Sequence, residues 1–400
     1  MSFAPPPLDG TTVLDFTRVL SGPYCTMLLA DMGARVIKIE QPGRGDDTRA
    51  WGPPFIQGES AYFLSVNRNK ESLSLDLKMP EGQRVIAQLL ERADVLVENF
   101  RPGAMDRLGL GFGTLSIRHP RLVYCSISGF GQSGPRRAER GYDAVMQAEG
   151  GLMSITGDAE GPSFRLGVAI SDIVTGLFAA QGIAMALLAR VRSGLGQNVD
   201  IGMLDATAAL LTYQAGIYFA TGQPPQRMGN RHPSIAPYET FSAADGELVV
   251  AVGNDEQWRR FCEVINKRGL AEDARFATNR DRVNHYDALR PLLAAALKLR
   301  PRGDWVTALK AAGVACGSVR EVPDVLADPQ IDARLMVETV EHVSAGAIRV
   351  LGVPVKLSGT PGTVRTAPPA LGQHTDRILR EDCGLSPAEI TTLRASGAVG

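Results

Sequence analysis

One carboxylate in this chain is set apart by its surroundings. The run GVAISDIVTG, residues 167–176, places Asp172 between an apolar stretch and the start of a long apolar segment. An acidic residue at a helix start can cap the helix, because its oxygens accept hydrogen bonds from the free N–H groups of the first turn. In a water-poor pocket the same group can act as a nucleophile. These ten residues leave both roles open.

Basic residues recur in the segments that follow predicted strands. Any one of them is readily explained as a solvated surface charge. As a set at strand ends, they suit an anionic ligand that carries phosphate groups. The set consists of Arg18, Lys78, Arg101, Arg107, Arg136, Arg137 and Arg140.

Several familiar motifs are absent or incomplete. The run GFGQSG, residues 129–134, matches GxGxxG, but Pro135 and two arginines follow where an apolar helix should begin. A flexible turn that lets backbone approach a ligand is the better interpretation. The phosphate loop GxxxxGK[ST], the zinc motif HExxH and the hydrolase motif GxSxG do not occur. We therefore expect no ATP-driven ligation and no metal site.

The composition of the chain limits the kinds of binding partner that we expect. The 400 residues have a formal net charge of −1 and 44% hydrophobic residues, so neither nucleic acid nor a membrane surface is expected as a partner. Five scattered cysteines without a CxxC pair argue against a disulfide framework. The start, MSFAPPPLDG, lacks the pattern of a secretory signal. We expect a cytoplasmic protein.

The first half of the chain alternates strand and helix patterns. This alternation predicts an α/β fold with a parallel sheet, in which ligands bind beyond the carboxyl ends of the strands. The predicted strands are 12–16, 35–40, 72–77, 94–98 and 121–128, and the predicted helices are 23–32 and 80–92.

The most apolar run, 173–191, is long enough to raise the question of a membrane span. Thr175, Gly176, Gln181 and Gly182 interrupt it, so we expect a helix buried in a large core. A helix over 202–219 and a polar linker over 221–237 should follow. A smaller unit then has a predicted strand at 247–253, helices at 255–267 and 286–299, strand-like runs within 340–357, and a helix near the C-terminus.

Eight motifs spread over nearly the whole chain resemble those of the class III CoA-transferases, the family of formyl-CoA:oxalate and carnitine CoA-transferases. Within this family the likeness is greatest to transferases of the succinyl-CoA:glutarate type, through RAWGPPF, RGYDAV and HPSIAPYETF. The eight motifs are LDGTTVLDFTRVLSGP, GARVIKIEQPGRGDDTR, SVNRNKESLSLDLKMPEG, ADVLVENFRPGAMDRLGLG, YCSISGFGQSGP, GYDAV, GVAISDIVTG and LGQHTDRIL.

The resemblance implies a fold and an assembly. It predicts a Rossmann-like large domain built from both chain ends, a smaller inserted α+β domain, and a homodimer of interlocked subunits. The implied boundaries are 1–222 for the N-terminal part of the large domain, 223–330 for the small domain with its linkers, and 331–400 for the return to the large domain.

The resemblance also implies site residues. Asp172 matches the family nucleophile. A basic position after the strand at 35–40 is Gln41 here, which removes one phosphate contact, and no glycine-rich loop of the formyl-CoA type is evident, which disfavours an oxalate-type acceptor. The positions that match CoA contacts are Leu20, Ser21, Leu75, Lys78, Asn99, Phe100, Arg101, Arg107, Arg140, Gly141, Tyr142 and Asp143.

The implied reaction transfers CoA from an acyl-CoA such as succinyl-CoA to a dicarboxylate such as glutarate or itaconate. CoA is then a substrate, and no permanently bound cofactor is expected. The intermediates are a mixed anhydride and an aspartyl-CoA thioester. An aspartate with a pKa of about 3.9 is ionised at neutral pH without a base. Backbone N–H groups near Asp172 or in the 229–236 loop are the candidate oxyanion donors.

Two questions stay open at this level. Arg18, Arg165 and His232 are candidates to bind the far carboxylate of a dicarboxylate, and each could instead be a surface ion-pair partner. The alternative activity is that of an α-methylacyl-CoA racemase. Such racemases use a His–Asp pair in a GHD motif, whereas this chain has Gly141, Tyr142 and Asp143, without the histidine that abstracts the proton.

Overall fold

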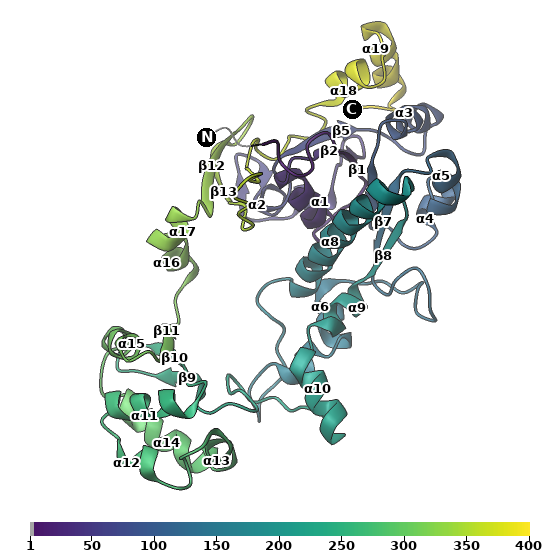
Figure 1. Ribbon diagram of the computed structural model, residues 1–400. Helices are drawn as coiled ribbons and strands as arrows, with labels where there is room; N and C mark the ends of the chain where they lie inside the picture. Colours follow the sequence, from purple (N-terminus) through teal and green to yellow (C-terminus); the bar gives the residue numbers. More distant parts are fainter. Residues whose placement is uncertain (1–3) are drawn as a thin grey trace. The chain divides into compact units, whose positions relative to one another are not determined.

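The computed structural model describes residues 4–400, which form two compact units (Figure 1). The larger unit contains the N-terminal part to Leu152, together with Leu166–Tyr213 and Pro329–Gly400. The smaller unit contains Met153–Arg165 and Gln214–Asp328. The larger unit is therefore assembled from three stretches of the chain, the last of them at its C-terminal end.

A six-stranded parallel sheet is the centre of the larger unit. Its strand order is β5-β2-β1-β6-β7-β8, and every neighbouring pair is parallel. Counted along the chain this order is 3-2-1-4-5-6, the order of a doubly wound Rossmann sheet. The predicted α/β fold with a parallel sheet is confirmed. The strands are β1 (Thr12–Asp15), β2 (Arg35–Glu40), β5 (Lys70–Ser74), β6 (Val95–Glu98), β7 (Val123–Ser128) and β8 (Asn198–Gly202).

Two details of the sheet differ from the sequence prediction. The third strand covers 70–74 instead of 72–77, because the chain turns after Leu75 and the Asp76 carboxylate accepts the Lys78 N–H at 2.8 Å. Strand β8 was not predicted. Its polar residues Asn198 and Asp200 hide the apolar alternation that would have identified it.

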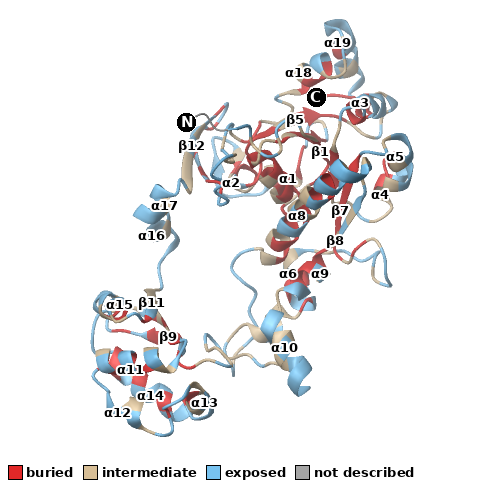
Figure 2. Ribbon diagram, in the orientation of Figure 1, coloured by how far each residue is buried: buried red, intermediate tan, exposed pale blue. Residues whose placement is uncertain are grey.

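Alternating residues of each strand feed two hydrophobic cores, one on each face of the sheet. In β1, Val13 faces a core completed by α1 (Ser21–Asp31) and α8 (Ile170–Ser193), whereas Leu14 faces the opposite core. Figure 2 shows the sheet as the buried centre of this unit. The opposite core is covered by α3 (Pro80–Leu90), α5 (Phe112–Arg118), α18 (Thr375–Glu381) and α19 (Pro387–Ser396).

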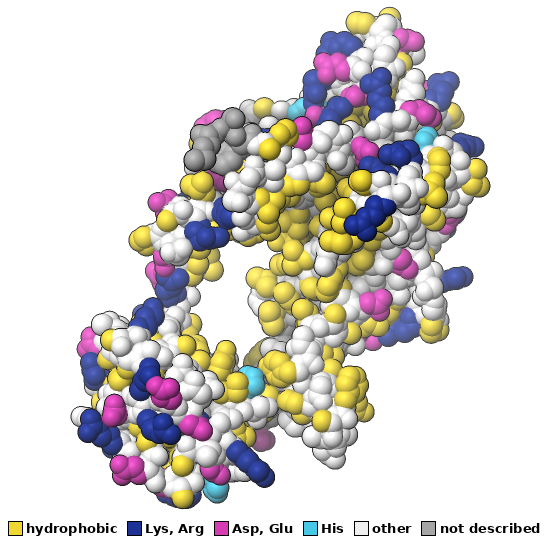
Figure 3. Space-filling model, in the orientation of Figure 1, with side chains coloured by type: hydrophobic (Ala, Val, Ile, Leu, Met, Phe, Trp, Pro, Cys, Tyr) yellow, Lys and Arg dark blue, Asp and Glu magenta, His cyan; other side chains and the backbone are white. Residues whose placement is uncertain are grey.

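Helix α8 is the predicted long apolar helix, but only one of its faces is buried. Ala179, Ile183 and Ala186 pack on the sheet, whereas Met185 and Leu188 are more than half exposed. Figure 3 shows hydrophobic side chains over this helix. Among residues 4–400, α8 is also the one helix whose length and hydropathy would suffice to cross a membrane. The predicted burial of this helix in a large core therefore holds for only one of its faces.

The predicted helix over 202–219 is two helices. Met203–Ala209 forms α9 and Thr212–Thr221 forms α10, with a turn between them at which Thr212 has a φ of +37°. A β-branched residue in the left-handed region interrupts the regular helix. No hydrophobic pattern announces this break, because the apolar residues continue through it.

The smaller unit has its own sheet and core. Its antiparallel strands β9 (Tyr238–Ser242), β10 (Glu247–Ala251) and β11 (Ala315–Ser318) lie in the order β11-β10-β9. The core packs around Trp258, Phe241 and Leu293. The helices that cover it are α11 (Asp255–Val264), α12 (Gly269–Glu272), α13 (Asn279–Asn284), α14 (Tyr286–Leu297) and α15 (Arg302–Ala311).

The remaining elements are short. In the larger unit they are η1 (Asp47–Ala50), β3 (Phe55–Ile56), β4 (Glu59–Ser60), α2 (Ala61–Ser65), α4 (Ala104–Arg107), α6 (Asp143–Glu149), α17 (Pro329–Ala333) and the hairpin β12 (Val337–His342) with β13 (Gly346–Leu351). The others are α7 (Leu152–Ile155) and α16 (Val322–Leu326). The hairpin accounts for most of the strand-like runs predicted near 340–357.

Candidate active site

A cleft lies at the carboxyl ends of β1, β6 and β7. Strands β1 and β6 are neighbours whose chains leave in opposite directions along the sheet, and such a switch point is where doubly wound sheets bind ligands. The volume of the cleft is about 350 Å³. We call it the Asp172 cleft. It is lined by Arg18, Val19, Ser21, Asp47, Asn99, Phe100, Arg101, Pro102, Ile127, Ser128, Gly129, Glu139, Arg140, Gly141, Tyr142, Asp172 and Met203.

Asp172 lies in the first turn of α8 but does not cap that helix. The N-cap residue is Ala169, and no side chain caps α8 from that position. Instead the Asp172 carboxylate lies near Ser21, the first residue of α1, whose hydroxyl and backbone N–H favour its ionised form. The first N–H groups of α1 have no intrahelical partner, so this helix start carries a positive partial charge.

The surroundings raise the pKa of Asp172 to about 7. Burial is the largest cause, and the nearby carboxylate of Asp143 adds to it, while the hydroxyl and backbone N–H of Ser21 oppose the rise. The sequence-based expectation of a fully ionised aspartate with an ordinary pKa is wrong. Near neutral pH this group exists in both forms, and its ionised form is poorly hydrated.

Apolar side chains account for the burial. Leu20, Met27 and Val66 form a small buried cluster, and Tyr62 and Ala169 pack on its edge. Ala169 immediately precedes α8, so this cluster lies against the helix start. Burial, followed by the charge of Asp172, raises the pKa of Tyr62 to about 12. The Tyr62 phenol thus shares the electrostatic environment of Asp172, although sequence reasoning did not select it.

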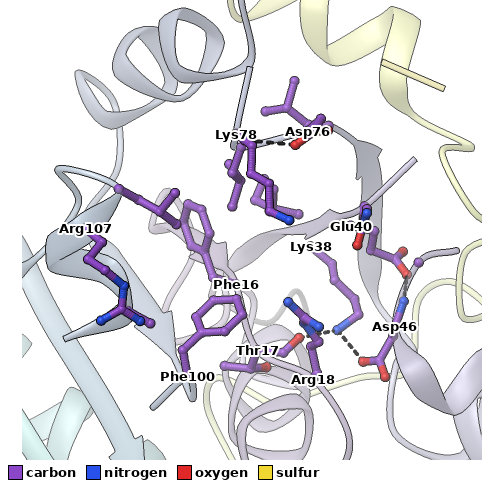
Figure 4. A pocket seen from close by; sticks show the side chains of 17 residues that line it. Phe16, Thr17, Arg18, Lys38, Glu40, Asp46, Asp76, Lys78, Phe100 and Arg107 are labelled. Atoms are coloured by element: carbon purple, nitrogen blue, oxygen red, sulfur yellow. Dashed lines mark hydrogen bonds and ion pairs between the residues drawn. The ribbon is translucent and has the colours of Figure 1, made fainter. Parts of the chain in front are cut away.

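A second cleft of about 280 Å³ holds the other basic residues. We call it the Lys78 cleft. Figure 4 shows Lys78 and Arg107 at its rim with the ring of Phe16 between them. At its floor the buried Lys38 ammonium lies 2.9 Å from the Asp46 carboxylate and donates to the carbonyl of Thr17 at 2.8 Å. Gln41 also lines this cleft. It stands at the position where the family pattern has a basic residue.

Arg18 and Phe100 line both clefts. The Arg18 guanidinium lies 4.8 Å from the centre of the Phe100 ring. Asn99 holds the Arg18 backbone from both sides: its Oδ1 accepts the N–H at 2.9 Å and its Nδ2 donates to the carbonyl at 2.7 Å. This arrangement joins the ends of β1 and β6 and places Arg18 between the two clefts.

Most of the predicted CoA positions line one of these clefts. Ser21, Asn99, Phe100, Arg101, Arg140, Gly141 and Tyr142 line the Asp172 cleft, and Leu75, Lys78, Phe100 and Arg107 line the Lys78 cleft. Leu20 belongs to the buried cluster beside Asp172. The Asp143 carboxylate accepts the backbone N–H of Ser171 at 2.9 Å and the Gln147 amide at 2.8 Å.

The three candidates for the acceptor carboxylate are not brought together within one unit. Arg18 lies in the larger unit, whereas Arg165 and His232 lie in the smaller one. Burial lowers the pKa of His232, which favours its neutral form. The roles of these residues remain predictions.

The first glycine of the GFGQSG run, Gly129, packs closely against backbone. A Cβ atom added to Gly129 would lie 2.6 Å from the backbone nitrogen of Gly141. This contact holds the 140–142 run against the end of β7. No helix begins between Gly129 and Asp143, as the sequence predicted, so the run does not open a dinucleotide-binding helix.

Comparison with known proteins identifies the family. Residues 8–375 match the model of CoA-transferase family III. A succinate–glutarate CoA-transferase of Agrobacterium fabrum is 42% identical over 382 residues, which cover 94% of this chain and 96% of that protein. Acetyl-CoA:oxalate CoA-transferase of Acetobacter aceti is 44% identical over 354 residues, which cover 88% and 90%. A solved structure, a CAIB/BAIF family protein from Brucella suis, has a TM-score of 0.85 at 40% identity and covers 95% of this chain and 100% of that chain.

The chain belongs to CoA-transferase family III. It is an enzyme of the CoA-transferase class, as the sequence resemblance predicted. The racemase alternative has less support, because the relatives named above are CoA-transferases and the cleft presents Tyr142 where a racemase has its histidine.

Proposed function

We propose that this enzyme transfers CoA from an acyl-CoA donor, with succinyl-CoA as the first candidate, to a dicarboxylate acceptor through covalent intermediates on Asp172. The observation that carries this proposal is the position of Asp172, which lines the cleft together with Ser21, whose hydroxyl and N–H favour its ionised form. A glutarate-using relative at 42% identity supports the dicarboxylate acceptor. Glutarate, itaconate and other dicarboxylates remain candidate acceptors.

The two clefts suit the two ends of an acyl-CoA. Lys78 and Arg107 in the Lys78 cleft would bind the phosphates of the nucleotide end, since ammonium and guanidinium groups recognise phosphate well. The pantetheine arm would pass Arg18 and Phe100, the residues shared by both clefts, and bring the thioester to Asp172. CoA enters this scheme as a substrate.

The chemistry proceeds without a base or ATP. The Asp172 carboxylate attacks the thioester carbonyl, the C–S bond breaks, and the CoA thiolate leaves as a mixed anhydride forms. The thiolate then attacks the aspartyl carbonyl, which frees the donor acid and leaves an aspartyl-CoA thioester. The acceptor carboxylate repeats the two steps in reverse. A thiol pKa of about 8.5 makes the thiolate an acceptable leaving group.

Ser21 is the proposed source of oxyanion stabilisation. Its N–H and hydroxyl favour the ionised form of Asp172, and the first turn of α1 adds a positive partial charge there. When Asp172 is acylated, the same donors remain beside its carbonyl, where charge develops in each tetrahedral intermediate. The apolar cluster around Leu20 excludes water, which protects the anhydride from hydrolysis.

Mass spectrometry of acyl-CoA products tests the proposal. The purified enzyme is mixed with succinyl-CoA and a panel of mono- and dicarboxylic acids, with Asp172→Ala alongside. A new acyl-CoA formed by the wild type alone supports transfer through Asp172 and names the acceptor. No exchange with any acid, together with solvent deuterium entering a branched acyl-CoA, would instead favour the racemase.

Assembly and location are further parts of the proposal. The exposed apolar face of α8 fits an interface with a second copy of the chain, because a continuous apolar surface of this kind is costly in water. A homodimer in the cytoplasm and domains at 1–222, 223–330 and 331–400 remain our predictions.

A further inference from the structure

Gln147 is a buried amide that touches neither cleft. It lies on α6 with 0% of its surface exposed. Its Oε1 accepts the backbone N–H of Leu166 at 2.8 Å, and its Nε2 contacts the carbonyl of Val168 at 3.4 Å. These bonds hold the exposed segment 166–168 that leads into α8. Neither the family resemblance nor the predicted site residues include Gln147.

The same amide fixes Asp143. Gln147 Nε2 donates to Asp143 Oδ2 at 2.8 Å, a pair with the i, i+4 spacing of helical neighbours. Asp143 Oδ1 then accepts the N–H of Ser171 at 2.9 Å. Because Ala169 supplies no side-chain cap, Asp143 provides the capping acceptor for the first turn of α8. Gln147 therefore reaches the turn that carries Asp172 by two routes, through Asp143 and through the segment before the helix.

We propose that Gln147 is a positioning residue for CoA transfer, which acts with Asp143 as a clamp that holds the start of α8 so that the Asp172 carboxylate faces Ser21 and the cleft. The proposal rests on the proposed role of Asp172 as nucleophile. A nucleophile must meet the thioester carbonyl in a narrow range of distance and angle, and a displacement of about 1 Å can cost 10²-fold in rate.

The clamp explains how a fully buried amide can be accommodated at this position. An unpaired buried polar group is costly, so a glutamine with 0% exposure is favourable only when its partners stay in place. Two of its three partners, Leu166 and Val168, lie within six residues of Asp172, and the third is the Asp143 carboxylate that caps the helix of Asp172. Movement of α8 relative to α6 breaks these bonds together, so the amide stabilises one arrangement of the two helices.

Gln147→Met tests the clamp, because methionine is unbranched and similar in length but forms none of these bonds. We expect kcat to fall about 10–100-fold while the KM for the acyl-CoA stays within about twofold, since Gln147 lines neither cleft. The matched control is Thr375→Val. Thr375 is equally buried and its Oγ1 accepts the Ser74 N–H at 3.1 Å, so this change also removes the acceptor of one backbone N–H.

The control separates positioning from general destabilisation. The clamp is supported if kcat falls in Gln147→Met but not in Thr375→Val, while the melting temperatures of the two variants drop by similar amounts. If Gln147→Met keeps kcat within twofold, if the KM rises as much as kcat falls, or if Thr375→Val loses as much kcat, the proposal is overturned.

Gln147→Glu decides the matter if the methionine variant does not fold. A protonated glutamate keeps both an acceptor for Leu166 and a donor for Asp143, whereas an ionised one places two carboxylates side by side. We expect kcat of this variant to fall relative to the wild type as pH rises and the proton shared with Asp143 is lost. A ratio of the two kcat values that does not change with pH overturns the proposal. The titratable or charged groups of other elements that interact with Asp172 or line its cleft are Asp143, Tyr62, Arg18, Asp47, Arg101, Glu139, Arg140 and Tyr142.

Measurements on the wild-type enzyme distinguish failure of the proposed function from failure of the Gln147 clamp. Failure of the wild type to transfer CoA or to form a CoA adduct on Asp172 refutes the proposed function itself. A wild type that transfers CoA, with Gln147 variants that match it, refutes the clamp alone.

Discussion

At the scale of single residues, Asp172 experiences opposing effects. Burial and the neighbouring Asp143 charge disfavour its ionised form, whereas the Ser21 donors and the start of α1 favour it. A carboxylate in water is a weak nucleophile because it is well hydrated. At this site hydration is replaced by two fixed donors, so the ionised fraction is smaller but more reactive.

The first prediction concerns the pH dependence of the wild type. If ionised Asp172 attacks the thioester, kcat/KM should fall about tenfold per pH unit below about 7, the pKa of this carboxyl. The measurement is the rate of CoA transfer between pH 5 and 9 in constant-ionic-strength buffers. A rate that stays flat down to pH 5 would show that this group titrates normally or takes no part in the attack.

Asp172→Asn should abolish CoA transfer and stabilise the folded protein at high pH. The folded-state pKa is above the unfolded value, so the folded protein binds the extra proton and loses stability as pH rises from about 4 through 7. Asparagine removes this cost, and we expect a melting temperature higher by a few degrees at pH 8 and little changed near pH 4, with transfer lost. Calorimetry at both pH values checks it. An equal gain at both would point to a cause other than charge.

At the scale of elements, loops meet the sheet through close backbone contacts. The end of β7 at Gly129 touches Gly141 so closely that a Cβ on Gly141 would lie 2.5 Å from the Gly129 Cα. Tyr142 and Arg140, on either side of Gly141, both line the Asp172 cleft. The glycine pair therefore sets the distance between this run and the end of the sheet.

Gly141→Ala should weaken acyl-CoA binding. The added methyl group must push the 140–142 run away from β7, so we expect the KM for the acyl-CoA to rise about tenfold or the fold to lose a few kcal/mol. Gly113→Ala is the control, since it lies on α5 with nothing within 4 Å of the added atom. Steady-state kinetics and thermal melts measure both. Equal behaviour of the two variants would contradict the role given to the glycine contact.

At the scale of the whole molecule, the apolar face of α8 has no covering element among the described residues of its own unit. Met185 is 57% and Leu188 53% exposed, and Leu177 and Phe178 extend the same apolar character along the helix. A second copy of the chain is the partner that we propose for this face. Burial of such surface contributes about 25 cal/mol per Å².

Met185→Arg should therefore shift the enzyme towards monomer. A buried, unpaired guanidinium at the centre of an apolar interface costs several kcal/mol, enough to change a dimer dissociation constant by orders of magnitude. Ile117→Arg is the matched control, because Ile117 is 82% exposed on α5, a helix of the opposite face of the sheet. Sedimentation velocity over a range of concentrations gives the answer. A wild type that is monomeric throughout would refute the proposed dimer.

Local patterns in the sequence predict much of this enzyme. Short, largely apolar runs predicted β1, β2, β6 and β7 to within two residues, because strands buried on both faces are apolar on both faces. The family motifs led to the CoA-transferase class. The same patterns missed β8 and the break between α9 and α10, where polar strand residues and a continuous apolar run conceal the true boundaries.

The sequence alone predicted the class of enzyme through its family motifs, and it pointed to one carboxylate in an apolar run and to a set of basic residues after strands as the candidate site. The tertiary structure decided how that carboxylate is tuned. Its pKa, its Ser21 donors, the Asp143 cap and the Gln147 amide come from α1, α6 and α8, which are brought together by packing. Electrostatic energy depends on distance and burial in space, and neither quantity can be obtained from separation along the chain.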